Sequence, residues 1–164
     1  MICHVNNSPR CWVAALYAGV AAGSIATIVQ IALWWSFWNV LPGIFYRDVR
    51  YTAAILLGKE SLQASDTLSL QHVFIATSIH VGLSIIYAIG ISYLIRCLNG
   101  KDSLMLGGLF GLGIFVINMY GFVLIFPWFV ETRDWITVTS HIVFGMSAAS
   151  VYKALTENDS YSTN

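Results

Sequence analysis

Four long stretches of the sequence contain no Lys, Arg, Asp or Glu, and they constrain the fold more than any other feature. In chain order they are residues 11–46, 67–95, 103–130 and 135–152. A helix that crosses a bilayer needs roughly 20 predominantly apolar residues, and three of the stretches exceed that length. The fourth is shorter, but Lys153 just beyond it can extend its ammonium group to the lipid headgroups. The pattern predicts an integral membrane protein.

The composition agrees with a membrane environment. Hydrophobic residues make up 57% of the chain and charged residues 10%, whereas a soluble domain carries about 25% charged residues. The formal net charge is zero, so nothing points to a nucleic-acid partner. The first apolar stretch is about twice as long as the apolar region of a signal peptide, and we expect it to stay in the mature chain.

The predicted fold is an all-α integral membrane four-helix bundle. It forms a single domain over residues 1–155, followed by a polar tail over 156–164. The four helices are expected at about 12–38, 70–96, 104–126 and 135–154.

The connection between the first two helices mixes apolar and charged residues. Pro42 and Gly43 interrupt the first helix, and "IFYRDVRYTAAILL" follows. Such a mixture is typical of an amphipathic segment that lies in the membrane interface or covers the helix ends. An ordinary surface connection is the alternative.

Aromatic residues gather where the predicted helices leave the membrane, as in an interfacial belt. We interpret them, together with the neighbouring Pro127, as interfacial anchors; the set is Trp34, Trp35, Trp38, Pro127, Trp128, Phe129 and Trp135.

The basic residues that flank the helices do not decide the orientation of the chain, because they divide equally between the two sides. The short second loop, with Arg96 and Lys101, favours both termini inside.

Each predicted helix carries one strongly polar side chain at a similar depth. At about 1.5 Å per residue, Gln30, His80, Asn118 and His141 lie roughly 9 to 13 Å below the first-loop face of the membrane. Polar groups facing lipid are costly, so these side chains should face the bundle interior. Together with Ser84, they form the candidate site, which we call the polar layer.

Glycine pairs support a relation between the two halves of the chain. Gly19 and Gly23 precede Gln30, and Gly107 and Gly111 precede Asn118 at the same spacing. These pairs allow close packing of helices. The chain is therefore interpreted as two helical hairpins in a parallel repeat, each of which ends with a histidine helix.

Several roles are open for the polar layer. It could be a hydrogen-bond network that fixes helix register. His80 and His141 could instead ligate a haem b iron, bind a quinone carbonyl, or transfer protons. We predict no cofactor and no metal, because two histidines are too few convergent groups. The sequence also contains no nucleophile motif, metalloprotease motif or phosphate loop.

Three motifs carry a resemblance to a known family: "HVGLSIIYAIG", "FPWF" and "SHIVFG", with a glycine-rich third helix that contains an asparagine. In this order they resemble small bacterial inner-membrane proteins of the YagU type, some of which carry a sodium:proline symporter label. The resemblance covers about two thirds of the chain. It implies a bacterial inner-membrane protein linked to envelope stress or acid tolerance, and it implies no reaction.

Two functions remain as hypotheses. The first is a non-enzymatic accessory subunit that packs in the bilayer against a membrane-protein partner or a second copy. The second is a stand-alone carrier whose polar layer binds haem, quinone or a permeating solute.

Overall fold

Helices account for nearly all of the structure, a computed structural model that describes residues 9–38, 40–63 and 69–161. The α-helices are α1 (Pro9–Leu33), α2 (Gly43–Leu57), α3 (Leu70–Ile95), α4 (Gly100–Val116) and α5 (Trp135–Tyr161). Short π or 3-10 segments join them: η1 (Trp34–Trp38), η2 (Lys59–Leu62), η3 (Ile117–Gly121), η4 (Phe122–Leu124) and η5 (Pro127–Thr132). The all-helical prediction is confirmed.

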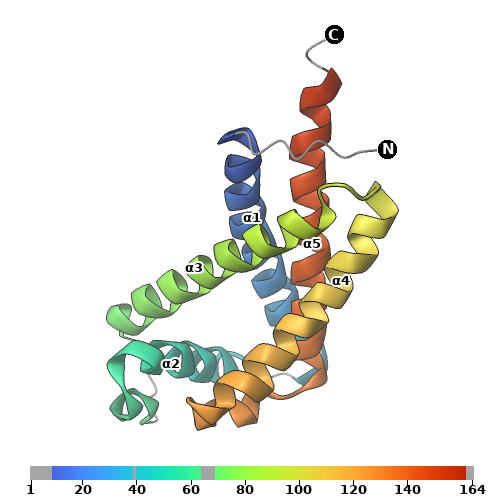
Figure 1. Cartoon of the computed structure of the whole chain (residues 1–164). Helices are drawn as coiled ribbons and strands as arrows, with labels where there is room; N and C mark the ends of the chain where they lie inside the picture. The colour runs from blue at the N-terminus through green and yellow to red at the C-terminus, as the bar shows by residue number, and fades with distance from the viewer. Residues whose placement is uncertain (1–8, 39, 64–68, 162–164) are drawn as a thin grey trace.

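The C-terminal helix α5 is the axis of the bundle. It packs along both α1 and α4, whereas α3 and α4 meet only briefly. Figure 1 shows α3 crossing α1 and α5 obliquely, with α2 beneath the N-terminal half of α3. The first described turns of α1 and the end of α5 lie at one end of the bundle, and α2 lies at the other.

Small side chains explain why α1 and α5 can approach each other closely. The buried stripe of α1 consists of alanine and glycine, and Ala148 and Ala149 of α5 are fully buried. Small residues let helix backbones come together, which maximises van der Waals contact where the surrounding lipid is as apolar as the helices.

The predicted glycine pairs lie at two helix crossings. A Cβ atom added at Gly19 would lie 2.7 Å from the Ile85 Cα of α3. One added at Gly111 would overlap the His141 carbonyl of α5, and Gly107 meets Gly145 in the same way. The first helix of each hairpin therefore presents its glycines to the second helix.

The two hairpins share this local pattern but not the same arrangement. A parallel repeat would make the packing of α3 on α4 equivalent to that of α5 on α1. The α5–α1 contact is extensive and the α3–α4 contact is slight, because α3 leans away from the bundle axis (Figure 1).

Three helical stretches are long and apolar enough to cross a membrane among the described residues: Arg10–Trp38, Leu70–Ile95 and Gly100–Leu124. The sequence predicted a fourth at 135–154. That helix, α5, exists but is less apolar, because Ser, Thr and His side chains interrupt it where it contacts its neighbours.

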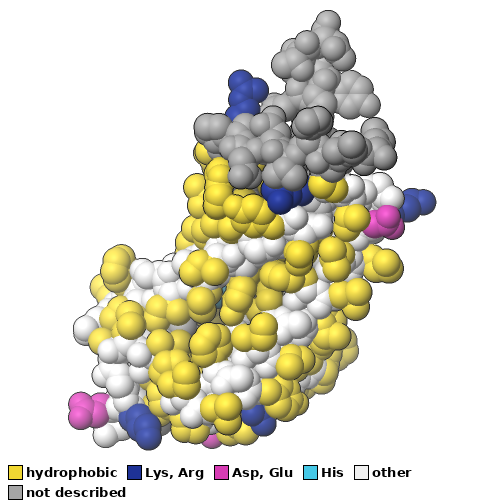
Figure 2. Space-filling model, in the orientation of Figure 1, with side chains coloured by type: hydrophobic (Ala, Val, Ile, Leu, Met, Phe, Trp, Pro, Cys, Tyr) yellow, Lys and Arg dark blue, Asp and Glu magenta, His cyan; other side chains and the backbone are white. Residues whose placement is uncertain are grey.

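The charged side chains gather at the two ends of the molecule. In Figure 2 hydrophobic side chains cover the middle of the visible face, while Lys, Arg, Asp and Glu appear above and below it. This distribution is the one expected of a multi-pass membrane protein, whose apolar band lies in the hydrocarbon core.

Element boundaries differ from the prediction at three places. The segment after Pro42 is a regular helix, α2. The third predicted helix changes to π geometry after Val116. The predicted polar tail is helical as far as Tyr161, and residues 162–164 lie outside the described residues.

We predict that Gly111→Ala destabilises the protein, because the added methyl group forces α4 away from the α5 backbone. Overpacking of this kind costs about 1–3 kcal/mol. The matched control is Gly113→Ala on the same helix, where an added Cβ would meet no atom within 4 Å. Thermal unfolding in detergent should show a lower Tm for Gly111→Ala and an unchanged or higher Tm for Gly113→Ala. Equal shifts would contradict the close packing of α4 on α5.

Candidate functional site

A directional chain of hydrogen bonds joins three helical segments inside the bundle. The Tyr87 hydroxyl of α3 donates to Asn118 Oδ1 at 2.6 Å. Asn118 Nδ2 lies 3.4 Å from His141 Nε2, and His141 Nδ1 lies 2.8 Å from the Thr137 carbonyl. The carbonyl can only accept, so Nδ1 carries the proton and Nε2 accepts from Asn118. Both ring nitrogens of this neutral imidazole are therefore satisfied.

The π segment η3 positions Asn118 in this chain of hydrogen bonds. After Val116 the helix widens over Ile117–Gly121, and such π turns are frequent at functional positions. The side chain of Asn118 reaches Tyr87 and His141, while the carbonyl of the next residue, Met119, accepts from Arg133 Nε at 2.6 Å. The widened turn is thus held from two sides.

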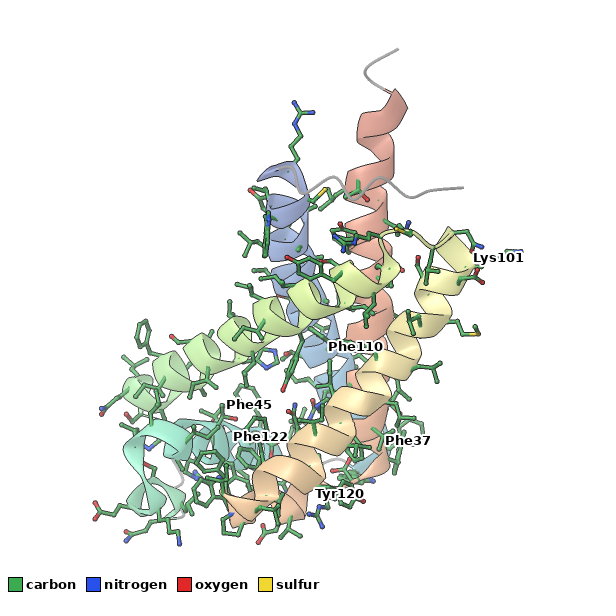
Figure 3. The ribbon with its side chains drawn as sticks, viewed as in Figure 1. Phe37, Phe45, Lys101, Phe110, Tyr120 and Phe122 are labelled. Carbon is green, nitrogen blue, oxygen red and sulfur yellow. The ribbon has the colours of Figure 1, made fainter. Side chains whose placement is uncertain are left out.

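Arg133 also lies over an aromatic ring, at 4.3 Å from its Cζ to the centroid of Tyr120. Figure 3 places Tyr120 at the end of the bundle opposite Lys101. The arginine therefore secures the end of the α4–η3 helix through one hydrogen bond and one cation–π contact, the latter worth about 0.5–2 kcal/mol.

His80 belongs to a second group, between α3 and α1, and it is exposed, whereas the sequence predicted that it faces the bundle interior. Its Nε2 lies 3.2 Å from Thr27 Oγ1 and 3.4 Å from the Gly23 carbonyl. The Thr27 hydroxyl already donates its hydrogen to Gly23, so it can only accept from His80. Nε2 therefore carries the proton, and Nδ1 has no partner within the part of the chain that the structure describes.

The polar layer is therefore divided. His80 and His141 bind different partners. Ser84 lies against Gly23, where an added Cβ would be 2.6 Å from the Ser84 Oγ. Gln30 is half-buried and makes no hydrogen bond to another described residue.

The two histidines do not fit the paired axial ligation of a haem iron. Such a ligand needs one free ring nitrogen, and both nitrogens of His141 already have partners. Among the described residues, no group of three or more His, Cys, Asp or Glu side chains could hold a metal ion.

A second polar cluster, which the sequence analysis did not identify as a site, fixes α2 to η5. The Tyr51 hydroxyl donates to Glu131 at 2.5 Å, and the Trp128 indole donates to the Tyr51 carbonyl at 3.0 Å. The Phe129 ring packs edge-on against Tyr51. The amphipathic pattern of α2 and the "FPWF" motif are the only sequence signals of this contact, and neither specifies the pairing.

An ion pair on α2 shapes the electrostatics of this cluster. Arg47 Nη2 lies 2.8 Å from Asp48 Oδ1. Burial raises the pKa of Asp48 from 3.8 to about 6, although Arg47 opposes the shift. Burial and the hydrogen bond to Glu131 raise the pKa of Tyr51 to about 12. The interface between α2 and the bundle thus contains a carboxyl group that holds its proton unusually well.

The predicted aromatic anchors occupy different environments. Trp35, Trp38 and Trp135 are exposed, as an interfacial belt requires. Pro127 starts η5, and Trp128 and Phe129 contact α2. Trp34 differs from the expectation, because it is only 3% exposed and packs with Ile44 and Ile136. The helix α2 covers it, which the sequence did not indicate.

The chain matches no protein-family model, no curated protein and no solved structure.

We predict that Asn118→Leu destabilises the bundle, because it leaves the Tyr87 hydroxyl and His141 Nε2 without partners. Unsatisfied buried groups cost about 1–3 kcal/mol. The control Tyr87→Phe removes a single hydrogen bond, typically worth about 0.6 kcal/mol in a membrane protein. Thermal unfolding in detergent should show a clearly larger loss for Asn118→Leu, and equal Tm values for the two variants would argue against a connected chain.

We predict that stability falls as the pH rises from 3.8 through about 6, because Asp48 binds its proton more tightly in the folded protein. The side chain is 24% exposed, so the effect is at most roughly 3 kcal/mol. Tm measured from pH 4 to pH 7.5 should show this decline, and Asp48→Asn should remove it. The control Glu60→Gln changes an exposed carboxyl group on η2; if it removed the decline equally, Asp48 would not be the titrating group.

Proposed function

We propose that this multi-pass membrane protein is a non-enzymatic accessory subunit that stabilises a larger complex in a bacterial cytoplasmic membrane. Both termini face the inside in this proposal, as the short loop with Arg96 and Lys101 favours. The family resemblance of the sequence motifs is part of the same proposal.

The observation that carries the proposal is the closed hydrogen-bond chain of Tyr87, Asn118 and His141. Each of the three side chains donates one hydrogen bond within the bundle, so the network stabilises the bundle without any ligand. The side chains that remain available to contact other molecules lie on the outside of the bundle. Large apolar side chains are exposed on α1, α3 and α4, where lipid or a membrane partner can cover them.

A carrier function is the second candidate, and one observation favours it. The Nδ1 atom of His80 and the side-chain amide of Gln30 have no partners among the described residues. In the membrane interior such groups can bind a quinone carbonyl or a small polar solute. This candidate requires a ligand that bridges separate groups, whereas the subunit proposal requires none.

The test is a gentle purification from native membranes, followed by mass spectrometry of the co-purifying bands and absorption spectra of the oxidised and dithionite-reduced protein. We expect a colourless protein with a stoichiometric membrane partner, and little effect of His80→Leu on its yield. A Soret band or a bound quinone that disappears in His80→Leu would overturn the proposal in favour of the carrier. His141→Leu serves as a comparison, because it should lower stability through Asn118 in either case.

A further inference from the structure

The helix α3 carries one continuous packing seam, of which this chain buries only half. Positions along the seam are separated alternately by four and three residues, the spacing that keeps one face of a helix against a neighbour. In order they are Leu70, Phe74, Thr77, Val81, Ser84, Ala88, Ile91 and Ile95.

The C-terminal half of the seam is the established interface inside the molecule. Ser84, Ala88, Ile91 and Ile95 are all buried there. Gly19 of α1 lies against the backbone at Ser84 and Ile85. The helix therefore uses this face to join the bundle.

The N-terminal half of the same face is uncovered. Leu70 is 88% exposed and Phe74 74% exposed, and Thr77 is also exposed. The cause is the oblique path of α3, which carries its N-terminal half away from α1 and α5 (Figure 1). The helix α2 packs against α3 but leaves these three side chains exposed.

An unpaired donor lies on the exposed half-seam and an unpaired acceptor lies beside it. The Thr77 hydroxyl makes no hydrogen bond within the described residues, although Ser78 beside it bonds to the carbonyl of Phe74. His80, three residues further along and also exposed, has its Nε2 committed to α1 and its Nδ1 open. In hydrocarbon, polar groups without partners are costly.

We infer that the exposed half-seam of α3 binds the same segment of a second copy of this chain. A two-fold axis along the membrane normal makes both α3 helices enter the membrane from the same side and brings equal depths together. Thr77 of one copy then donates to His80 Nδ1 of the other, and the reverse bond forms as well. Three residues, a rise of about 4.5 Å, separate the two groups along the axis, which an imidazole ring can bridge.

A second copy fits this surface better than an unrelated helix for two reasons. The half-seam continues an interface that already packs helices with the same spacing. The donor and the acceptor are also complementary to each other, so a second α3 supplies both missing partners at once. This inference goes beyond the proposed accessory function and does not depend on it.

The first test is photo-crosslinking in native membranes. Phe74 is replaced by the photoreactive residue benzoylphenylalanine, and the control carries it at Ile86, which is 61% exposed on another face of α3. We expect a covalent dimer at Phe74 that contains only this chain, and no such dimer at Ile86. No dimer at Phe74, or a product with a different protein or with lipid, would overturn the inference. A crosslink between Ile86 and a different protein would support the accessory function, and it would not contradict the dimer.

The second test measures the dimer Kd by energy transfer between labelled copies in vesicles. Thr77→Val removes both hydrogen bonds of the symmetric pair and keeps the shape of the side chain. We expect its Kd to rise roughly eightfold, the product of two bonds of about 0.6 kcal/mol each. Thr77→Ser, which keeps the hydroxyl, should change the Kd less than about twofold. An unchanged Kd in Thr77→Val would overturn the pairing with His80.

Discussion

Direct contact between the backbones of α4 and α5 is the constraint on which the rest of the structure depends. Gly107, Gly111 and Gly145 leave no side chain between the two helices, and lipid provides no hydrophobic driving force to compensate for looser packing. Once α4 lies against α5, the π turn after Val116 brings Asn118 within hydrogen-bonding distance of His141. A methyl group at Gly111 would act on both the packing and the hydrogen bonds.

The side chains of the polar layer follow from this packing in two different ways. Asn118 and His141 complete each other's hydrogen bonds and bind α3 through Tyr87. His80 instead binds α1 with one nitrogen and leaves the other open. Two histidines at similar predicted depths therefore have different chemistry: one is part of a closed network, and the other can bind a further group.

The end of the bundle that carries α2 is built on a different principle. Hydrogen bonds from Tyr51 and Trp128 hold α2 against η5, and the Arg47–Asp48 ion pair lies within α2 itself. The same helix covers Trp34 and packs on α3, while the exposed half-seam of α3 remains open.

The sequence by itself determined the helical class, the apolar stretches and the positions of the glycines, because these depend on local composition and spacing. It placed Asn118 and His141 at similar depths, but it did not predict the contact between Asn118 and Tyr87. The tertiary structure alone decided that His80 binds α1, that Trp34 is buried, that Tyr51 meets Glu131 and that α3 leans away from the bundle. These features depend on the angles and rotations of packed helices, which the sum of many weak contacts sets and which no short segment of sequence encodes.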